Sequence, residues 1–561
     1  MDKTTDALDR FFGRGAPTIS LRGGEALARI GQPVGGLYRL EAGRIAELKP
    51  APNGAPELVA VHRPGALLGA VEALDDGVHH SELVALRDSE LHVLPIRKAE
   101  RLLRRDSHVL ADVARSALRR LGAREPDAQR RSSILGFVAV CDSVIMREFT
   151  EAVAERTRKL GRKTVVLGAE AGHLSPAELS RLEAENDLVF MAVERGQPDF
   201  SAFCNRQIDR LVLVGTMMTP PSAGPIPIAA AAIAANRLMD VILIQPADAR
   251  QLSGSEVWLA AAPASRLFQV RQSDGGDLDR MARVYAGRSV GLVLSGGGAR
   301  AYAHVGVVRA LRELGVPIDF SAGNSMGAII AAGVAMGWDN MEMEARLRDA
   351  FVTSNPLTDI AFPILAMTRG REVEARLQRH FGEAQISDLW LPFACVSTDL
   401  TSGRPHNHRR GLLRRALRAS LSLPGILPPV IEDGHVLVDG AMVDNLPVGL
   451  VSAEHDGWTL GVDVGGAEGL RPDDLRLRPS PWGWLASGAW RHGPPIISVL
   501  IRAATVGTEA AMAATRDALD ITIVPQVDMV GLQDWKAYVP AVEAGYRATM
   551  ARAAEFAVMA A

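Results

Sequence analysis

The sequence predicts a multidomain protein with an N-terminal β-roll and helix, a middle parallel α/β domain and a C-terminal α/β domain. Three observations support this fold class. Short strand-like runs separated by glycines fill residues 1 to about 95, apolar runs alternate with helical stretches from residue 133 to about 275, and a strand, a glycine turn and a helix follow from residue 289. We therefore expect domains at 1–125, 133–275 and 285–561.

Composition limits the class of protein and its compartment. The chain has 561 residues, a net charge of −3 and three cysteines far apart in sequence. This charge gives no reason to expect nucleic acid as a partner, and the cysteines form neither a disulfide framework nor a zinc-binding spacing. The first residues lack an apolar signal region, and Asn236, Arg237 and Asp240 interrupt the apolar stretch 225–246. The sequence predicts a cytoplasmic protein and is compatible with peripheral contact on the inner face of the membrane.

The first segment accounts for the β-roll. Strand-like runs occur at Gly36–Ile45, Leu58–His62 and Leu91–Pro95, with glycines between them. From Arg97 to about Gly122 the apolar residues recur with a helical period. The polar stretch 125–131 contains a proline and is typical of a linker.

The middle segment accounts for the parallel α/β domain. Strands separated by helices imply a parallel sheet. The first run, GFVAVCDSV, resembles a strand that enters a nucleotide-binding turn, but neither GxxxxGK[ST] nor a lysine follows, so we expect no phosphate loop. The apolar runs are 134–141, 164–167, 188–193, 210–214, 241–245 and 267–270.

The C-terminal segment opens on GLVLSGGGARAYAHVG at 291–306. A strand at 289–294 meets Gly296, Gly297 and Gly298, and a glycine turn before a helix is suited to hold an anion. A second strand at 318–322 leads into GNSMG, which fits the GxSxG nucleophile elbow. In that motif the glycines leave room for a strained turn that lifts the serine hydroxyl above the sheet.

A serine that attacks an ester needs donors for the oxyanion and a base for its proton. The backbone amides of Gly296–Gly298 can supply the donors, and a helix that begins at about Ala299 would add its dipole. The histidines after residue 320 lie in no distinctive motif, whereas HVLVDGAMVDNLPV runs a strand into a tight turn that exposes Asp439. The pattern suggests a Ser325–Asp439 site in which the carboxylate acts directly on the hydroxyl.

GGGAR, GNSMG and DGAMVDNLPV together resemble the patatin-like phospholipases, and within them the neuropathy target esterase group of lysophospholipases. The resemblance covers residues 280–465 most closely. It implies a compact α/β/α hydrolase domain with its core at 290–450, Ser325 as nucleophile, Asp439 as base and Gly296–Gly298 as the oxyanion loop. It also implies a phospholipid or lysophospholipid substrate and chemistry without a metal or an organic cofactor. The supporting residues would be Arg300, Gly323, Gly327 and Gly440.

Several positions near these motifs have alternative interpretations. Ala301 replaces the last glycine of the family's GxGxxG pattern, and its methyl group fits if the residue is helical. Asp399 and Asp444 are the alternatives to Asp439 as the base, and we expect them to cap or brace loops. We expect His304 to be a helix residue packed near the oxyanion loop.

The N-terminal stretch LARIGQPVGGLYRLEAGRI resembles the cyclic-nucleotide-binding β-roll, with Gly31, Tyr38 and Gly43 in family-like positions. The family's phosphate cassette carries a glutamate for the ribose and an arginine for the cyclic phosphate. Here Ala70 stands in place of the glutamate, and the region 79–81 has no arginine. Because phosphate recognition depends on that charge-assisted pair, we expect no cyclic nucleotide to bind and a fold retained for packing or protein contact.

Two features suggest contact with a membrane, and each has a plain alternative. The tryptophans of PSPWGWLASGAW are suited to a membrane interface, and the alternative is that they cap the core. The basic run 404–418 is suited to contact with anionic headgroups, and the alternative is that it is solvated surface charge. The tryptophans are Trp482, Trp484 and Trp490.

Two other classes of function compete with a hydrolase. One is a regulatory or scaffold protein with a nucleotide-sensor-like domain and a silent hydrolase domain. The intact serine, aspartate and glycine loop argue against this alternative. The other is a dinucleotide-dependent enzyme, but the glycine loop lacks the third glycine and no acidic residue follows at ribose distance.

Overall fold

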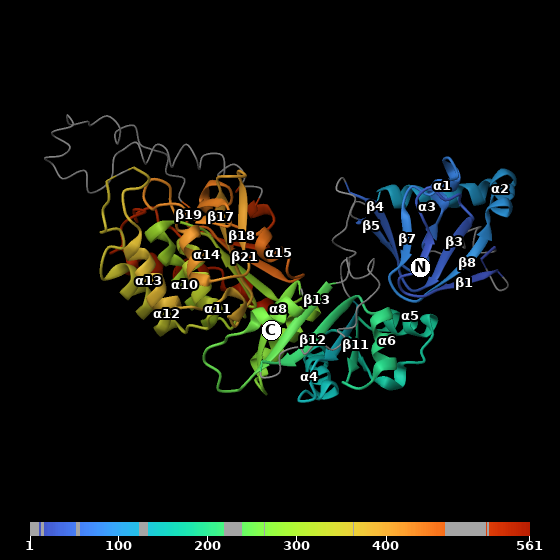
Figure 1. The fold of residues 1–561 in the computed structure, drawn as a ribbon, viewed down its shortest axis with the longest axis horizontal. Helices are drawn as coiled ribbons and strands as arrows, with labels where there is room; N and C mark the ends of the chain where they lie inside the picture. Colours follow the sequence, from blue (N-terminus) through green and yellow to red (C-terminus); the bar gives the residue numbers. More distant parts are fainter. Residues whose placement is uncertain are drawn as a thin grey trace. The chain divides into compact units, whose positions relative to one another are not determined.

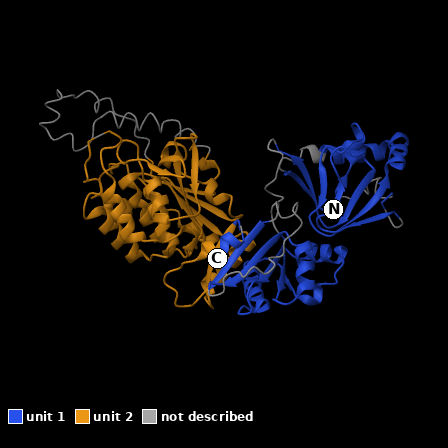
Figure 2. Ribbon diagram, viewed as in Figure 1, with its two compact units in different colours: residues 1–244, 258–265 blue, residues 245–257, 266–561 orange. Residues whose placement is uncertain are grey.

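The computed structural model describes residues 11–12, 16–51, 56–122, 133–217, 238–262, 264–362, 364–465, 512 and 515–560. The chain divides into two compact units: residues 1–244 with 258–265, and residues 245–257 with 266–561 (Figure 2). The change of unit after residue 244 falls within the segment 133–275 that we assigned to a middle domain. The division into three domains stays a prediction.

The described residues 16–95 form antiparallel sheets with the orders β1-β8-β3-β6 and β2-β7-β4-β5 (Figure 1). The expected strand Gly36–Ile45 is wrong in one respect, because it is divided between β3 and β4. Gly43 turns the chain there with φ +91°, and an added Cβ would lie 2.2 Å from the Ser89 hydroxyl. The strands are β1 (Thr18–Leu21), β2 (Ala26–Ala28), β3 (Gly36–Ala42), β4 (Ile45–Pro50), β5 (Pro56–His62), β6 (Leu67–Leu68), β7 (Glu82–Ala85) and β8 (Ser89–Pro95).

Helices α1 (Ala70–Leu74), α2 (Ile96–Arg105) and α3 (Ser107–Gly122) accompany the β-roll. The expected continuous helix from Arg97 to Gly122 is broken at Asp106, whose backbone is extended. The Asp106 carboxylate accepts the His108 N–H at 2.9 Å and so caps the start of α3. The predicted linker 125–131 lies outside the described residues.

The middle segment contains the predicted parallel sheet. Its order in unit 1 is β10-β11-β9-β12-β13, with each of these pairs parallel. Strands β9 and β11 are buried along their whole length, as expected of strands covered on both faces. The elements are β9 (Ile134–Ala139), α4 (Met146–Lys159), β10 (Thr164–Leu167), η3 (Ala169–Ala171), α5 (Pro176–Glu185), β11 (Leu188–Val193), α6 (Pro198–Gln207), β12 (Arg210–Thr216), β13 (Leu238–Gln245) and α8 (Ser255–Ala261).

Unit 2 contains the sheet that carries the candidate site, with the order β19-β20-β17-β16-β15-β21-β22 and β18 paired to β17. The pairs from β17 to β22 along this order are parallel, and β18, β19 and β20 join antiparallel. The strands of this sheet are β15 (Val290–Leu294), β16 (Phe320–Gly323), β17 (Phe393–Asp399), β18 (Arg404–His408), β19 (Val430–Glu432), β20 (His435–Asp439), β21 (Trp458–Val462) and β22 (Ile521–Ile523). Unit 2 also contains β14 (Arg266–Arg271), which is not a member of this sheet.

Helices cover both faces of this sheet. Leu292 and Leu294 of β15 share a buried core with α10 and α11, whereas a Cβ on Gly291 would lie 2.1 Å from Val451 of α15. Because alternate residues of a strand face opposite sides, α15 and the α10–α11 pair lie on opposite faces. The helices are α9 (Gly275–Ala286), η4 (Gly298–Tyr302), α10 (Ala303–Glu313), α11 (Met326–Ala335), α12 (Asn340–Leu347), η5 (Arg348–Val352), α13 (Arg371–Phe381), η6 (Ile386–Asp388), α14 (Leu413–Ser420), η7 (Gly440–Met442), α15 (Gly449–Ser452), α19 (Tyr538–Met550) and α20 (Ala553–Ala560).

Within the described ranges, no helix combines the length and the apolar character needed to cross a bilayer. The tryptophans Trp482, Trp484 and Trp490 lie outside those ranges, so their expected contact with a membrane stays a prediction.

Candidate active site

Ser325 lies in the turn between β16 and α11, where the sequence predicts it. Its backbone has φ +52° and ψ −129°, a region that L-residues other than glycine rarely occupy. The turn is tight against the neighbouring strand, because a Cβ on Gly327 would lie 2.4 Å from the Ser295 carbonyl oxygen. Gly323 ends β16 on the other side of the turn. The geometry is that of a strained elbow, which presents the serine side chain beyond the end of the sheet.

Asp439 is the last residue of β20 and is buried. Its carboxylate accepts the Ala441 N–H at 2.9 Å and the Asn324 amide at 3.2 Å, and the Ser325 side chain lies close enough to lower the pKa of this carboxyl group. Burial raises the pKa of Asp439 above its ordinary value, and these hydrogen bonds oppose the rise. Gly440 follows in η7 and is also buried. The structure thus brings together the two residues that the sequence pairs, 114 positions apart.

The glycine loop follows β15 and approaches Ser325. A Cβ on Gly296 would lie 3.2 Å from the Cβ of Ser325. The Gly296 N–H donates to the Asn445 carbonyl at 3.3 Å, whereas no described residue accepts a hydrogen bond from the N–H of Gly297 or Gly298. Gly298 has φ +54°, which favours glycine at this turn. Two amide donors in the glycine loop are therefore available for an anion.

The helix expected from about Ala299 begins differently. The chain first forms the 3₁₀ turn η4, and α10 starts only at Ala303. The reason is that the Ala299 N–H donates outward to the Leu532 carbonyl at 2.9 Å. Ala301 is buried within η4, so its methyl group is accommodated in a helical turn as expected. The Arg300 guanidinium donates to the Val530 carbonyl at 2.7 Å and joins the loop to the segment around residue 530.

Three polar residues near Ser325 and Asp439, the candidate dyad, were not identified from the sequence. The Asn324 amide donates to the side-chain oxygen of Asn445 at 3.0 Å as well as to Asp439, and the Asn445 amide donates to the Gly296 carbonyl at 3.3 Å. The Ser420 hydroxyl accepts the Ser325 N–H at 2.9 Å and donates to Asn324 at 3.2 Å. This Asn324–Ser420–Asn445 network connects the elbow, the aspartate and the glycine loop. The only signal in the sequence is that Asn324 and Asn445 lie inside the two motifs.

The alternatives to Asp439 occupy other places. Asp399 accepts hydrogen bonds from the Thr401 N–H at 2.9 Å and the Ser402 hydroxyl at 2.6 Å, so it braces the turn after β17. Burial raises the pKa of Asp444 to about 6, and the Asp444 N–H donates to the Gly440 carbonyl at 2.8 Å. His304 is fully buried in α10, and burial lowers its pKa to about 4. Its Nε2 lies 2.8 Å from the Ser295 carbonyl oxygen, so it supports the start of the glycine loop as a neutral donor.

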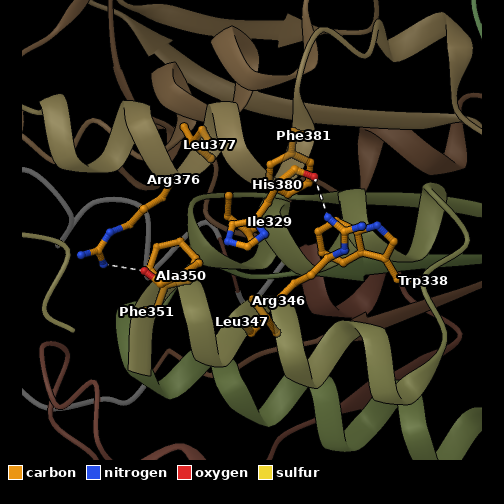
Figure 3. Close-up of a pocket in the computed structure, with 10 residues that line it drawn as sticks. All are labelled: Ile329, Trp338, Arg346, Leu347, Ala350, Phe351, Arg376, Leu377, His380 and Phe381. Atoms are coloured by element: carbon orange, nitrogen blue, oxygen red, sulfur yellow. Dashed lines mark hydrogen bonds between the residues drawn. The ribbon is translucent and has the colours of Figure 1, made fainter. Parts of the chain in front are cut away.

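A small pocket lies among α11, α12, η5 and α13 (Figure 3). Ile329 on α11, one turn beyond Ser325, contributes to it, and Arg376 closes one end by donating to the Ala350 carbonyl at 2.5 Å. Neither the dyad nor the glycine loop lines this pocket. Its apolar lining is Ile329, Trp338, Leu347, Phe351, Leu377 and Phe381.

In the N-terminal segment, Ala70 begins α1 and is buried, and His79 is buried as well. The Ser81 hydroxyl donates to Glu47 at 2.8 Å instead of being free for a ligand. Among the described residues, one group of possible metal ligands has its donor atoms within 4.8 Å of one another: the exposed Asp75, Asp76 and His80. Exposed acidic groups of this kind are common without a metal, and we assign it no role.

Comparisons with known proteins agree with this description. A family model described as patatin-like phospholipase matches residues 292–451, which include Ser325, Asp439 and the glycine loop, and a cyclic nucleotide-binding domain model matches residues 18–106. The fold and the site therefore define a protein with a hydrolase domain of the patatin-like phospholipase class and an N-terminal domain of the cyclic-nucleotide-binding fold.

The chain belongs to the NTE family. It is 30% identical over 546 residues to an NTE family protein of Mycobacterium tuberculosis, a match that covers 94% of this chain and 90% of the relative. It is 28% identical to patatin-like phospholipase domain-containing protein 6 of Mus musculus and 27% identical to neuropathy target esterase sws of Drosophila melanogaster. These two matches cover 84% of this chain and 39% and 37% of the respective relatives. The resemblance inferred from the motifs is confirmed.

Proposed function

We propose that the protein is a serine esterase that hydrolyses acyl ester bonds of phospholipids or lysophospholipids. One observation carries this proposal: Ser325 is held at φ +52° in the elbow, and its side chain lies close enough to the buried Asp439 to lower the pKa of that carboxyl group. A serine in a strained turn beside a carboxylate of raised pKa has both a nucleophile and a base for it.

In the proposed reaction Ser325 Oγ attacks the ester carbonyl while Asp439 takes the hydroxyl proton. The negative charge that forms on the carbonyl oxygen is stabilised by the amides of Gly297 and Gly298, with Gly296 completing the loop. The tetrahedral intermediate collapses, the ester C–O bond breaks, and Asp439 returns the proton to the departing glycerol-based alcohol. Asp439 then takes a proton from the water that attacks the acyl-serine, and it returns this proton to Ser325 Oγ as the acyl–Oγ bond breaks and the fatty acid leaves.

The surroundings of the site support these roles. The first turn of α11 follows Ser325 directly, and its dipole favours negative charge at that end. Burial of Asp439 disfavours its charged form and so makes the carboxylate a better proton acceptor than one in water. Each proton and charge in the scheme is handled by a group of this chain, and we propose that the reaction needs no metal and no organic cofactor.

We further propose that the protein acts at the cytoplasmic face of a membrane and that its N-terminal domain binds no cyclic nucleotide. The second point rests on Ala70 and on the absence of an arginine at 79–81, which leave a phosphate without its ion pair. Thermal denaturation of the full chain with and without cyclic AMP or cyclic GMP tests it. An unchanged midpoint is expected, and a rise that saturates with nucleotide would contradict it.

The first experiment measures fatty-acid release from lysophosphatidylcholine and from diacyl phosphatidylcholine by the wild type, Ser325→Ala and Asp439→Asn. We expect release by the wild type, near-complete loss in both variants, and labelling of Ser325 by a fluorophosphonate in the wild type. Equal rates in all three proteins would refute the dyad. No release from either lipid, together with no labelling, would favour the regulatory alternative.

A further inference from the structure

Unit 2 exposes a compact set of large apolar side chains between η5 and α13. We call Ile360, Phe362, Ile364 and Leu365 the apolar tip. Phe362 is 85% exposed, Ile364 81%, Leu365 74% and Ile360 49%. Single exposed apolar residues are ordinary, but four within six positions form a patch of the kind that marks a binding surface.

The apolar tip is held by ordered backbone contacts. Ile360 and Thr368 form an antiparallel bridge, and the Ala361 N–H donates to the Met367 carbonyl at 2.8 Å. The Ile364 N–H donates to the Phe362 carbonyl at 2.8 Å. The chain therefore doubles back and presents these side chains outward in a fixed arrangement.

The same segment is attached to the loop that supports the dyad. The Met367 N–H donates to the Gly425 carbonyl at 2.9 Å, and the Thr368 hydroxyl donates to the Ile426 carbonyl at 2.7 Å. A few residues earlier in that loop, the Ser422 carbonyl accepts the Asp439 N–H at 3.0 Å. The apolar tip is thus connected through one short loop to the proposed catalytic base.

A second exposed apolar pair borders the glycine loop. Met529 is 69% exposed and Leu532 is 51% exposed. The Leu532 carbonyl accepts the Ala299 N–H at 2.9 Å, directly after the proposed oxyanion donors. Exposed apolar residues therefore occur in two segments, one bonded to the loop that holds Asp439 and one bonded to the glycine loop.

Positive charge follows the apolar tip in the chain. Arg369 and Arg371 are exposed, and neither guanidinium has an acidic partner among the residues that the structure describes. The nearby Asp359 is engaged by backbone, because it accepts the Arg371 N–H at 2.7 Å. Apolar side chains with unpaired arginines beside them match a bilayer surface, where acyl chains lie beneath anionic headgroups.

We propose that the apolar tip inserts into a phospholipid surface, with Arg369 and Arg371 on the headgroups, and that this docking brings the dyad to its substrate. The proposal rests on the proposed function for its purpose, since a lipid ester must leave the bilayer to reach Ser325. The docking itself depends only on the apolar tip and the two arginines, so it can be tested separately from catalysis.

The test uses the full chain with Ser325→Ala, which keeps binding separate from hydrolysis. Co-sedimentation is measured with vesicles of phosphatidylcholine alone and with phosphatidylglycerol added in equal part. Phe362→Ser with Ile364→Ser should lower the partition onto both vesicle types by about tenfold or more, because the insertion of each apolar side chain is lost. Met341→Ser is the matched control, since Met341 is 83% exposed on α12, and it should bind as the parent does.

Arg369→Gln with Arg371→Gln should weaken binding to the vesicles that contain phosphatidylglycerol and leave binding to phosphatidylcholine unchanged. Equal loss on both vesicle types would overturn the role of the arginines. Phe362→Ser with Ile364→Ser is also made in the protein that keeps Ser325. This variant should hydrolyse soluble p-nitrophenyl butyrate within twofold of the wild-type rate, whereas its release of fatty acid from vesicle lipid should fall by at least about tenfold.

Undiminished vesicle binding by the apolar-tip variant, or no binding by the parent, would overturn the proposal. A parent that forms a dimer in sedimentation velocity, loses it with the apolar tip and ignores vesicles would identify a second copy of the chain as the occupant and also overturn it. Absence of p-nitrophenyl butyrate hydrolysis by the wild type would count against the proposed function alone, because vesicle binding is scored independently.

Discussion

Asn445 is the residue whose removal tests the arrangement of the site most directly. Its side chain accepts a hydrogen bond from Asn324 at 3.0 Å and donates one to the Gly296 carbonyl at 3.3 Å. Asn324 in turn donates to Asp439. Asn445→Ala removes both side-chain bonds but keeps the Asn445 carbonyl, which still accepts the Gly296 N–H. The variant should therefore weaken the positioning of Asp439 and of the glycine loop while both remain present.

The size of the effect follows from the two bonds. A neutral hydrogen bond contributes about 0.5–1.5 kcal/mol net, and the longer bond to Gly296 belongs at the lower end. A total of about 1–2 kcal/mol corresponds to roughly a 5- to 30-fold fall in kcat. Direct loss of an oxyanion donor costs about 100- to 1,000-fold, so a positioning residue should fall clearly short of that.

The assay compares kcat and KM on p-nitrophenyl butyrate for the wild type, Asn445→Ala and Asn355→Ala. Asn355 is an exposed asparagine whose side chain accepts one backbone N–H, that of Leu357 at 2.9 Å, and its loss should not change kcat. A fall in kcat with KM nearly constant is expected for Asn445→Ala. A kcat within twofold of wild type, or a rise in KM alone, would refute the positioning role.

Asn445→Asp adds a readout that a merely structural role would not change. It keeps an acceptor for Asn324 and places a second carboxylate near Asp439 through the shared amide. Nearby negative charge raises a carboxyl pKa, and the carboxylate is the active form of the base. The acid limb of the kcat profile should therefore move to higher pH, and an unmoved limb would contradict the coupling.

The remaining predictions concern stability. Because the pKa of Asp439 is raised in the folded chain, ionisation of this carboxyl group lowers the stability of the protein above that pKa. Asp439→Asn should therefore raise Tm at pH 8 and raise it less at pH 4. Equal Tm values for the variant and the wild type at pH 8 would contradict this prediction. Asp444→Asn should have a free energy of unfolding higher than that of the wild type by an amount on the order of 2 kcal/mol at pH 8, measured by urea denaturation. This difference should disappear as the pH falls from about 6 to below 4. Gly327→Ala, whose Cβ would lie 2.4 Å from a carbonyl oxygen, should cost about 3 kcal/mol or more in urea, whereas Gly449→Ala in open space should not destabilise.

The secondary structure was predictable where one signal dominates. Buried parallel strands are continuous apolar runs, so the expected 164–167 and 188–193 agree with β10 and β11 to the residue. The predictions failed where backbone geometry, and not hydrophobicity, decides. Gly43 divides one expected strand and Asp106 one expected helix, and neither interrupts the apolar pattern around it.

The candidate site was predictable to the extent that its chemistry is local. GNSMG contains the turn and the proposed nucleophile within five residues, and the structure confirms a turn there. The Asn324–Ser420–Asn445 network is different, because its members are joined across 96 and 121 positions. A hydrogen bond between distant polar side chains leaves no periodicity and no composition signal, so it becomes visible only when the strands and their loops are placed.

Three departures from ordinary local structure lie at the candidate site in unit 2. Ser325 has positive φ, Asp439 is a buried carboxyl group, and the amides of Gly297 and Gly298 have no acceptor within the described ranges. Positive φ at Ser325 and a buried carboxyl group at Asp439 each cost stability, and nothing in packing requires them to lie beside the glycine loop. The proposed transfer of a proton and stabilisation of an oxyanion would supply a reason other than folding, because they need a nucleophile, a base and free donors in one site.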